Sequence, residues 1–296
     1  MKKFSIITTV VTFIALILGN LVVATNSGDA CGATWPVCNG RVFPDFTNYH
    51  ILIEYSHRLM VPLLAVLTLI NAVGAITKHR NRKAVVVLAL LSLGMLVFQS
   101  AVGGLNVLLG TPPGFTTLDV TFSQVLLLIL VLLSYSLHET KIELNQVSWS
   151  TVSMSYRAFV LGFIVYVAQV ILGAFFKHSR ASNVLLDIPA AEYLIQSESI
   201  SNMIYSLHWV ATVVIFVAAL WYVIYATKFK YHKLLAWAYL ITILLNAVVG
   251  FVIVITGNVI LASSIHMIVS TVTMVIGGMI LGGYWFKLQK KAINAS

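Results

Sequence analysis

The feature that most constrains the fold is a series of eight apolar runs, each long enough to cross a bilayer as a helix. A hydrocarbon core about 30 Å thick requires about 20 apolar residues in helical conformation. Lipid offers no hydrogen bonds, so each run must satisfy its backbone groups internally, as a helix does. The runs lie at 4–25, 50–77, 84–109, 116–137, 155–176, 200–227, 233–256 and 259–286. The sequence predicts an all-α polytopic membrane protein.

The composition supports this class. Charged residues make up 9% of the chain and the mean hydropathy is +0.96, whereas soluble domains carry about 25% charged residues. The first run follows Met1, Lys2 and Lys3 and could be taken for a signal peptide. Its apolar stretch is long and no clean small-x-small cleavage site follows, so we expect a retained helix.

Most of the 18 Lys and Arg residues fall on one side of the predicted membrane. They are Lys2 and Lys3, the basic residues of the 78–83 and 228–233 loops, Lys141, Arg157, and Lys287, Lys290 and Lys291 of the tail. Positive loops face the cytoplasm, which predicts that both the N and C termini are cytoplasmic. This topology and attraction to an anionic inner leaflet explain the net charge of +9, so no nucleic-acid partner is needed.

Both cysteines, Cys31 and Cys38, lie in the predicted external loop 26–49. A pair confined to the oxidising side of the cell membrane favours a disulfide bond, and two unpaired thiols in a short loop are the alternative.

An internal repeat divides the chain. At an offset of 147 residues Gly103 falls on Gly250, Asp119 on His266 and Ser123 on Ser270. We therefore expect two repeated four-helix bundles, 1–140 and 155–296, joined by a cytoplasmic linker at 141–154. Four spans per half is an even number, so both halves enter the membrane in the same direction.

Three histidines and an aspartate fall at about one depth near the external face: His57, His208, His266 and Asp119. Ionisable residues inside a membrane are costly and mark functional sites by default. Two imidazoles facing each other across a bundle can hold heme iron as axial ligands, so we expect His208 and His266 to bind heme b. The alternative for either histidine is a hydrogen-bonded packing residue.

Glu54 lies three residues before His57, on the same helical face. We expect Glu54 to act as a base or charge stabiliser beside a cofactor at His57; the alternative is an interfacial glutamate paired with Arg58. A di-metal site would normally need two Glu-x-x-His motifs, and the sequence has one.

The role of Asp119 has two interpretations. It could bind iron weakly through oxygen or cap the fourth span, and we favour the cap because Thr116 and Thr117 precede it. At the outer end of the fifth span, Lys177, His178 and Arg180 could neutralise heme propionates. The alternative for these three is an ordinary interfacial role.

Several motifs resemble the heme A synthase family, which assists cytochrome oxidase assembly. They are Cys31-Gly32-x-x-Trp35-Pro36-x-Cys38-x-Gly40, then Glu54-x-x-His57-Arg58, then Lys177-His178-x-x-Ala181-Ser182, with His208 and His266 in the second half. The resemblance covers nearly the whole chain. It implies an oxidoreductase that oxidises a methyl group of heme O to the formyl group of heme A for terminal oxidases.

The resemblance also implies roles for residues and partners. The C-terminal half would bind heme b through His208 and His266, and the N-terminal half would hold heme O near His57 and the catalytic Glu54, below the cysteine pair. Partners would be the heme O-producing enzyme and terminal oxidase subunits.

Asp119 departs from the family pattern, which has a fourth histidine there. Either His57 alone holds the substrate heme, or the N-terminal site has lost its chemistry. A heme-binding electron carrier or oxidase-assembly protein without heme A synthesis is therefore the first alternative function. A transporter with structural histidines is the second.

Overall fold

The computed structural model describes residues 1–32, 34–109, 112–137, 149–190, 192–228, 230–257 and 259–288. Across these ranges the chain is helical, with α1 (Lys2–Ala24), α2 (Tyr49–Lys78), α3 (Lys83–Leu108), α4 (Thr116–Ser136), α5 (Trp149–His178), α6 (Ala181–Leu185), α7 (Glu198–Lys228), α8 (Lys233–Thr256), α9 (Ile260–Gly283) and a π-helical turn η1 (Tyr284–Leu288). Eight of the helices are long and apolar enough to cross a membrane. This confirms the predicted all-α, multi-pass class; the short α6 was not predicted.

The predicted linker at 141–154 is only partly described. Residues 141–148 lie outside the described ranges, as do Lys290 and Lys291 of the tail. From Trp149 onward the expected linker is already helical and belongs to α5. Helix α5 is therefore longer than the apolar run that predicted it, because its first residues are less apolar than the core of the span.

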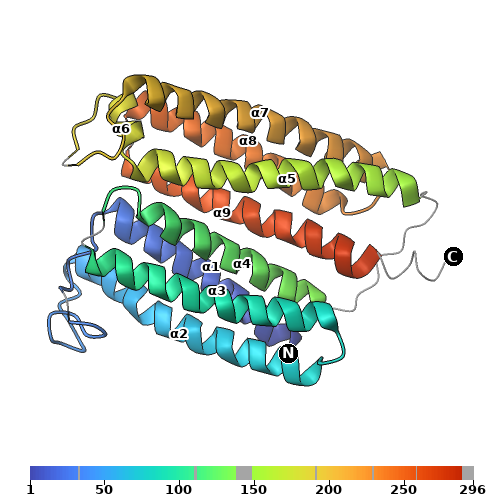
Figure 1. The fold of residues 1–296 in the computed structure, drawn as a ribbon, viewed down its shortest axis with the longest axis horizontal. Coiled ribbons are helices and arrows are strands. Elements are labelled where there is room, and N and C mark those ends of the chain that lie inside the picture. Colours follow the sequence, from blue (N-terminus) through green and yellow to red (C-terminus); the bar gives the residue numbers. More distant parts are fainter. Residues whose placement is uncertain are drawn as a thin grey trace.

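The long helices run side by side in two groups, α1–α4 and α5–α9 (Figure 1). The start of α1 and the end of α9 lie at one end of the molecule, and the loop before α2 and the short α6 lie at the other. This arrangement is compatible with termini that share one side of the membrane. The side that faces the cytoplasm is still a prediction.

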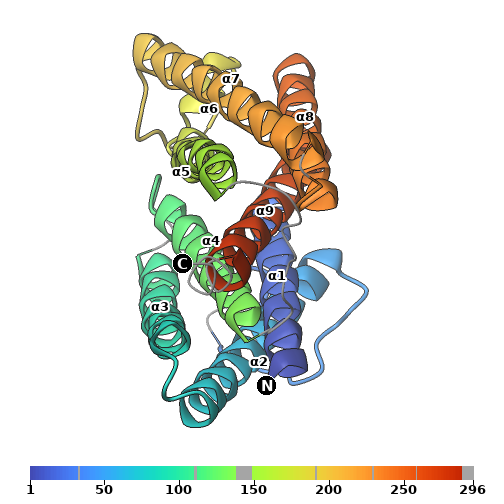
Figure 2. The same cartoon turned by 90° about the vertical axis from the view of Figure 1, so that its right-hand side faces the viewer.

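Helices α4 and α9 lie at the centre, where the two groups meet (Figure 2). In their apolar windows 56% and 50% of residues are buried, against 28% or less in the other six spans. A Cβ atom at Gly278 of α9 would lie 2.9 Å from Leu128 Cδ1 and 3.0 Å from Val131 Cγ1 of α4. Small residues allow such close approach between membrane helices. The other spans leave many large apolar side chains exposed on the surface of the molecule.

The packing differs between the two groups. The core of the second group is rich in aromatic residues, including Tyr156, Phe159, Tyr222 and Tyr239. The core of the first group is aliphatic and formed mostly by alanine, leucine and valine. Both cores lie mainly toward the end of the molecule where α2, α4, α7 and α9 finish. The opposite ends of these four helices are therefore left to the polar residues of the candidate site.

Candidate functional site at one end of the bundle

The four predicted site positions gather at one end of the molecule. His57 (α2), Asp119 (α4), His208 (α7) and His266 (α9) each lie in the N-terminal half of their helix. All four helices begin at the end that carries the cysteine loop (Figure 1). The start of α2 is fixed by Asn48, whose side chain accepts a hydrogen bond of 3.0 Å from the His50 amide.

Each of the four side chains faces a glycine on a neighbouring helix. A Cβ atom added at Gly19 (α1) would lie 3.0 Å from His57 Cε1, and one at Gly173 (α5) would lie 2.9 Å from His208 Cε1. One at Gly250 (α8) would lie 3.3 Å from His266 Cε1, and one at Gly103 (α3) would lie 3.7 Å from Asp119 Oδ1. The imidazole rings therefore occupy space that a side chain at any of these glycine positions would fill. Glycine here serves the close approach of a side chain to a helix backbone.

The environment of His266 fixes the role of its ring nitrogens. Nδ1 lies 3.1 Å from the carbonyl oxygen of Asn246 on α8. A carbonyl can only accept, so Nδ1 carries the proton, and a neutral ring then leaves the lone pair of Nε2 free for a metal.

His208 is held through its backbone and not through its ring. Gln169 of α5 donates to the His208 carbonyl oxygen (3.0 Å) and to Thr212 Oγ1 (2.5 Å). Nδ1 of His208 is buried without a hydrogen-bond partner among the described residues, and the same holds for Nδ1 of His57. A buried polar atom without a partner is costly, so both rings are suited to a ligand that the chain itself does not supply.

Asp119 does not cap α4, and this prediction was wrong. The N-cap is Phe115, and Asp119 lies inside the first turn. Its carboxylate instead accepts a short hydrogen bond from the side-chain amide of Gln99 on α3. Half-buried in an apolar bundle, the carboxylate gains more from a partner on the next helix than from backbone amides of its own.

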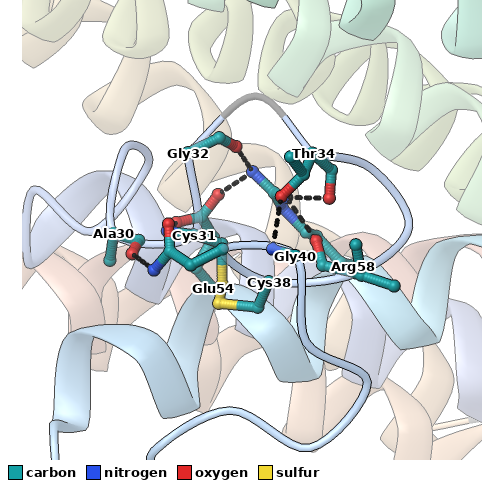
Figure 3. Close-up of polar contacts among 10 residues, drawn as sticks. Ala30, Cys31, Gly32, Thr34, Cys38, Gly40, Glu54 and Arg58 are labelled. Atoms are coloured by element: carbon teal, nitrogen blue, oxygen red, sulfur yellow. Dashed lines mark hydrogen bonds and ion pairs between the residues drawn. A yellow bond between two sulfur atoms is a disulfide. The ribbon is translucent and has the colours of Figure 1, made fainter.

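The cysteine loop covers the start of α2 (Figure 3). Cys31 and Cys38 form a disulfide bond with an S–S distance of 1.99 Å, as predicted, and both are fully buried. Next to the disulfide loop, Arg58 Nη2 lies 2.6 Å from Glu54 Oε1. The Glu54–Arg58 pair that the sequence offered as the alternative to a catalytic role is thus formed. Both side chains are largely buried in the protein, and Glu54 is 4% exposed.

The second half has no counterpart to this ion pair. The alignment of His57 with His208 places Tyr205 at the position of Glu54 and Trp209 at that of Arg58. These two rings pack edge to face with centroids 6.3 Å apart. The two halves therefore differ in chemistry, with a charged pair beside one histidine and aromatic side chains beside the other.

The three basic residues at and just beyond the end of α5, Lys177, His178 and Arg180, have different surroundings in the structure. Lys177 Nζ donates to Ser263 Oγ of α9 at 2.9 Å, three residues before His266. The backbone carbonyl of His178 accepts from the amide of Gly114 (2.8 Å), while Arg180 is the N-cap residue of α6 and is exposed. Lys177 is thus the member of the trio placed near the His208–His266 pair. A depression of about 570 Å³ lies elsewhere, between the 112–113 and 192–196 loop segments.

Among the described residues no group of three or more His, Cys, Asp and Glu side chains is arranged to hold a metal ion. The family model of cytochrome oxidase assembly proteins, COX15-CtaA, matches residues 43–276. The chain belongs to this family. The matched range contains Glu54, Asp119 and the three intramembrane histidines.

Two individual relatives are similar along almost the whole chain, and a third along about three fifths of it. A heme A synthase of Halalkalibacterium halodurans is 29% identical over 281 residues, which are 92% of this chain and 93% of the relative. A heme A synthase of Alkalihalophilus pseudofirmus is 27% identical over 278 residues, again 92% and 93%. One from Shouchella clausii is 30% identical over 183 residues, or 62% and 60%.

Sequence reasoning missed the polar partners on the neighbouring helices. Gln99 and Gln169 both lie in the middle of apolar runs, where an amide is as unusual as a histidine. The 147-residue offset gave a usable signal, because it pairs Gln99 with Asn246. Gln99 contacts Asp119, and Asn246 contacts His266, which is the repeat equivalent of Asp119.

Proposed function

We propose that this chain is a membrane oxidoreductase that oxidises a methyl group of heme O to the formyl group of heme A. The observation that carries the proposal is the set of three intramembrane imidazoles and Glu54 at one end of the bundle, in a chain of this family. The heme O-producing enzyme and terminal oxidase subunits are the partners this activity would require. We also propose that the cysteine loop faces outward and that both termini are cytoplasmic.

His208 and His266 are the proposed axial ligands of heme b. The residues fit such a group: Nε2 of His266 is free because Nδ1 donates to Asn246, and Nδ1 of His208 has no partner. Gly173 and Gly250 leave room for the rings. Lys177 reaches the outer end of α9 and is placed to pair with a propionate. When bound there, heme b supplies one-electron transfer.

In the N-terminal half we propose that His57 and Glu54 face the substrate heme. His57 offers a ring without a partner on Nδ1, and Glu54 brings a buried carboxylate one turn away on the same helix. Asp119 replaces the family's fourth histidine and is held by Gln99. His57 would then be the single imidazole on the substrate side.

The bond between Asp119 and Gln99 also favours a second candidate function. A carboxylate already engaged by an amide is a poor replacement for an axial imidazole, so the chain could be a heme-binding electron carrier or oxidase-assembly protein without heme A synthesis. The transporter alternative finds no support in family membership.

The deciding experiment extracts hemes from aerobically grown cells that supply heme O and express this chain. We expect heme A in the extract, and its loss in a Glu54→Gln or His57→Ala variant that still inserts into the membrane. Heme b bound to the purified protein without any heme A in the cells would overturn the enzyme proposal in favour of the second candidate.

A further inference from the structure

We propose that the oxidised Cys31–Cys38 loop is a positioning element for Glu54, with Arg58 as the connecting residue. The disulfide would then control where the carboxylate lies. The inference deepens the proposed function, since it concerns the residue to which that proposal gives a chemical role. It is argued from hydrogen bonds between the loop and α2.

Both oxygens of Glu54 are engaged, each by a different donor. Oε1 accepts from Arg58 Nη2 at 2.6 Å, and Oε2 accepts from the backbone amide of Cys31 at 2.7 Å. Bonds of this kind to an ionised carboxylate are short and about twice as strong as neutral ones. One of the two donors therefore belongs to a disulfide-bonded residue, which fixes the carboxylate against the loop (Figure 3).

Arg58 contacts the loop on both sides of the ring that the disulfide closes. Its Nη2 donates to the carbonyl oxygen of Gly32 (2.6 Å) and its Nη1 to that of Val37 (3.1 Å). Gly32 follows Cys31 directly and Val37 precedes Cys38 directly. The planar guanidinium fork can reach both carbonyls at once only while the ring holds them together.

The ring is reinforced by hydrogen bonds that also depend on the cysteine positions. The backbone amide of Asn39 donates to the carbonyl oxygen of Cys31 (2.9 Å), and the backbone amide of Cys38 donates to the carbonyl oxygen of Arg41 (3.0 Å). Loop, guanidinium and carboxylate thus form one unit. Removing the covalent closure would weaken the contacts of Arg58 and of the Cys31 amide together.

Reduction of the loop by an external dithiol follows thiol–disulfide exchange. The dithiol transfers two electrons and two protons to the Cys31–Cys38 disulfide and is itself oxidised to a disulfide. The S–S bond of the loop breaks, and Cys31 and Cys38 become thiols. Coupling is reciprocal in binding free energy. If the closed loop stabilises the Glu54 position, Glu54 must stabilise the closed loop by the same amount, which makes the coupling measurable without any heme.

The test is a redox titration of the purified full-length chain with dithiothreitol, read as the fraction of thiols labelled by an alkylating reagent. We expect Glu54→Gln to shift the equilibrium toward the reduced form by about tenfold, which is about 30 mV for a two-electron couple. Arg58→Lys should shift it in the same direction, because lysine keeps the charge but loses the fork. The matched control is Asp29→Asn, which removes an exposed carboxylate two residues from Cys31 and should leave the midpoint unchanged.

A second measurement reads the carboxylate of the unaltered chain, and the Glu54→Gln variant serves only to assign the infrared band. Reduction should shift the infrared carboxylate band that is absent in Glu54→Gln. The inference would be overturned if both variants had the redox midpoint of the unaltered chain, or if the Glu54 infrared band did not shift on reduction. Neither readout involves heme A, so a chain that makes no heme A can still show the coupling, and a chain that makes it can lack the coupling.

Discussion

The Gln124 side-chain amide of α4 donates to Thr271 Oγ1 of α9 at 2.8 Å, and the two residues are 147 positions apart. The same offset relates Gly103 to Gly250 and Asp119 to His266 in the sequence. A residue that bonds to its own repeat equivalent must lie close to the axis that relates the two copies. An approximate twofold axis between α4 and α9 would place this contact at the junction of the predicted halves.

The Gln124–Thr271 bond is expected to stabilise the junction modestly. Interhelical hydrogen bonds in membrane proteins contribute about 0.6 kcal/mol on average, because the unfolded helices also find partners in the membrane. A double-mutant cycle with Gln124→Leu and Thr271→Val, measured by unfolding in detergent, should give a coupling free energy of about that size. Thr77→Val is the control, since Thr77 bonds only within its own exposed helix face. Strictly additive effects would contradict a direct bond.

Replacing the proposed heme b ligands should remove a spectral signal. Because His208 and His266 would each supply one axial bond, His208→Ala and His266→Ala should abolish the low-spin heme b absorbance of the purified protein. His79→Ala is the control, as His79 caps α2 at the far end of the molecule. Retention of the low-spin spectrum in both ligand variants would exclude this pair.

The glycine contacts make a more specific prediction. Gly173→Ala should push a methyl group against His208 Cε1, 2.9 Å away. Overpacking costs about 1–3 kcal/mol, which would lower heme affinity by about 5-fold to 150-fold. Gly94→Ala is the matched control, because a Cβ atom there meets nothing within 4 Å. Heme content per purified chain is the measurement, and equal content in the two variants would contradict the proposed role of the ring.

Asp119→His tests the altered position. If Asp119 lies beside the substrate-side iron, the new imidazole should convert a heme held by His57 alone into a six-coordinate low-spin form, seen by optical and electron paramagnetic resonance spectra. Asp119→Asn keeps the size and the contact with Gln99 and should not produce this change. An unaltered spectrum in Asp119→His would show that position 119 does not reach the iron.

The sequence predicted a large part of this molecule. Hydropathy gave the eight spans, cysteine placement gave the disulfide, and the motif residues gave the family. The cap assigned to Asp119 was wrong because a favourable N-cap composition is a local signal, and α4 begins earlier, with its cap at Phe115. The Glu54–Arg58 pair was foreseen only as an alternative, because helical spacing permits the contact without requiring it.

What the sequence by itself determined is everything that depends on a single segment: which segments are long and apolar enough to cross the membrane, and which ionisable residues they carry. Tertiary structure alone decided the partners, namely Gln99 for Asp119, the Cys31 amide for Glu54, Asn246 for His266 and Gln124 for Thr271. The physical reason is that the hydropathy of a segment's own residues decides whether that segment can lie in lipid. The contacts between helices depend on how each helix is rotated about its axis and how closely glycines let it approach its neighbour.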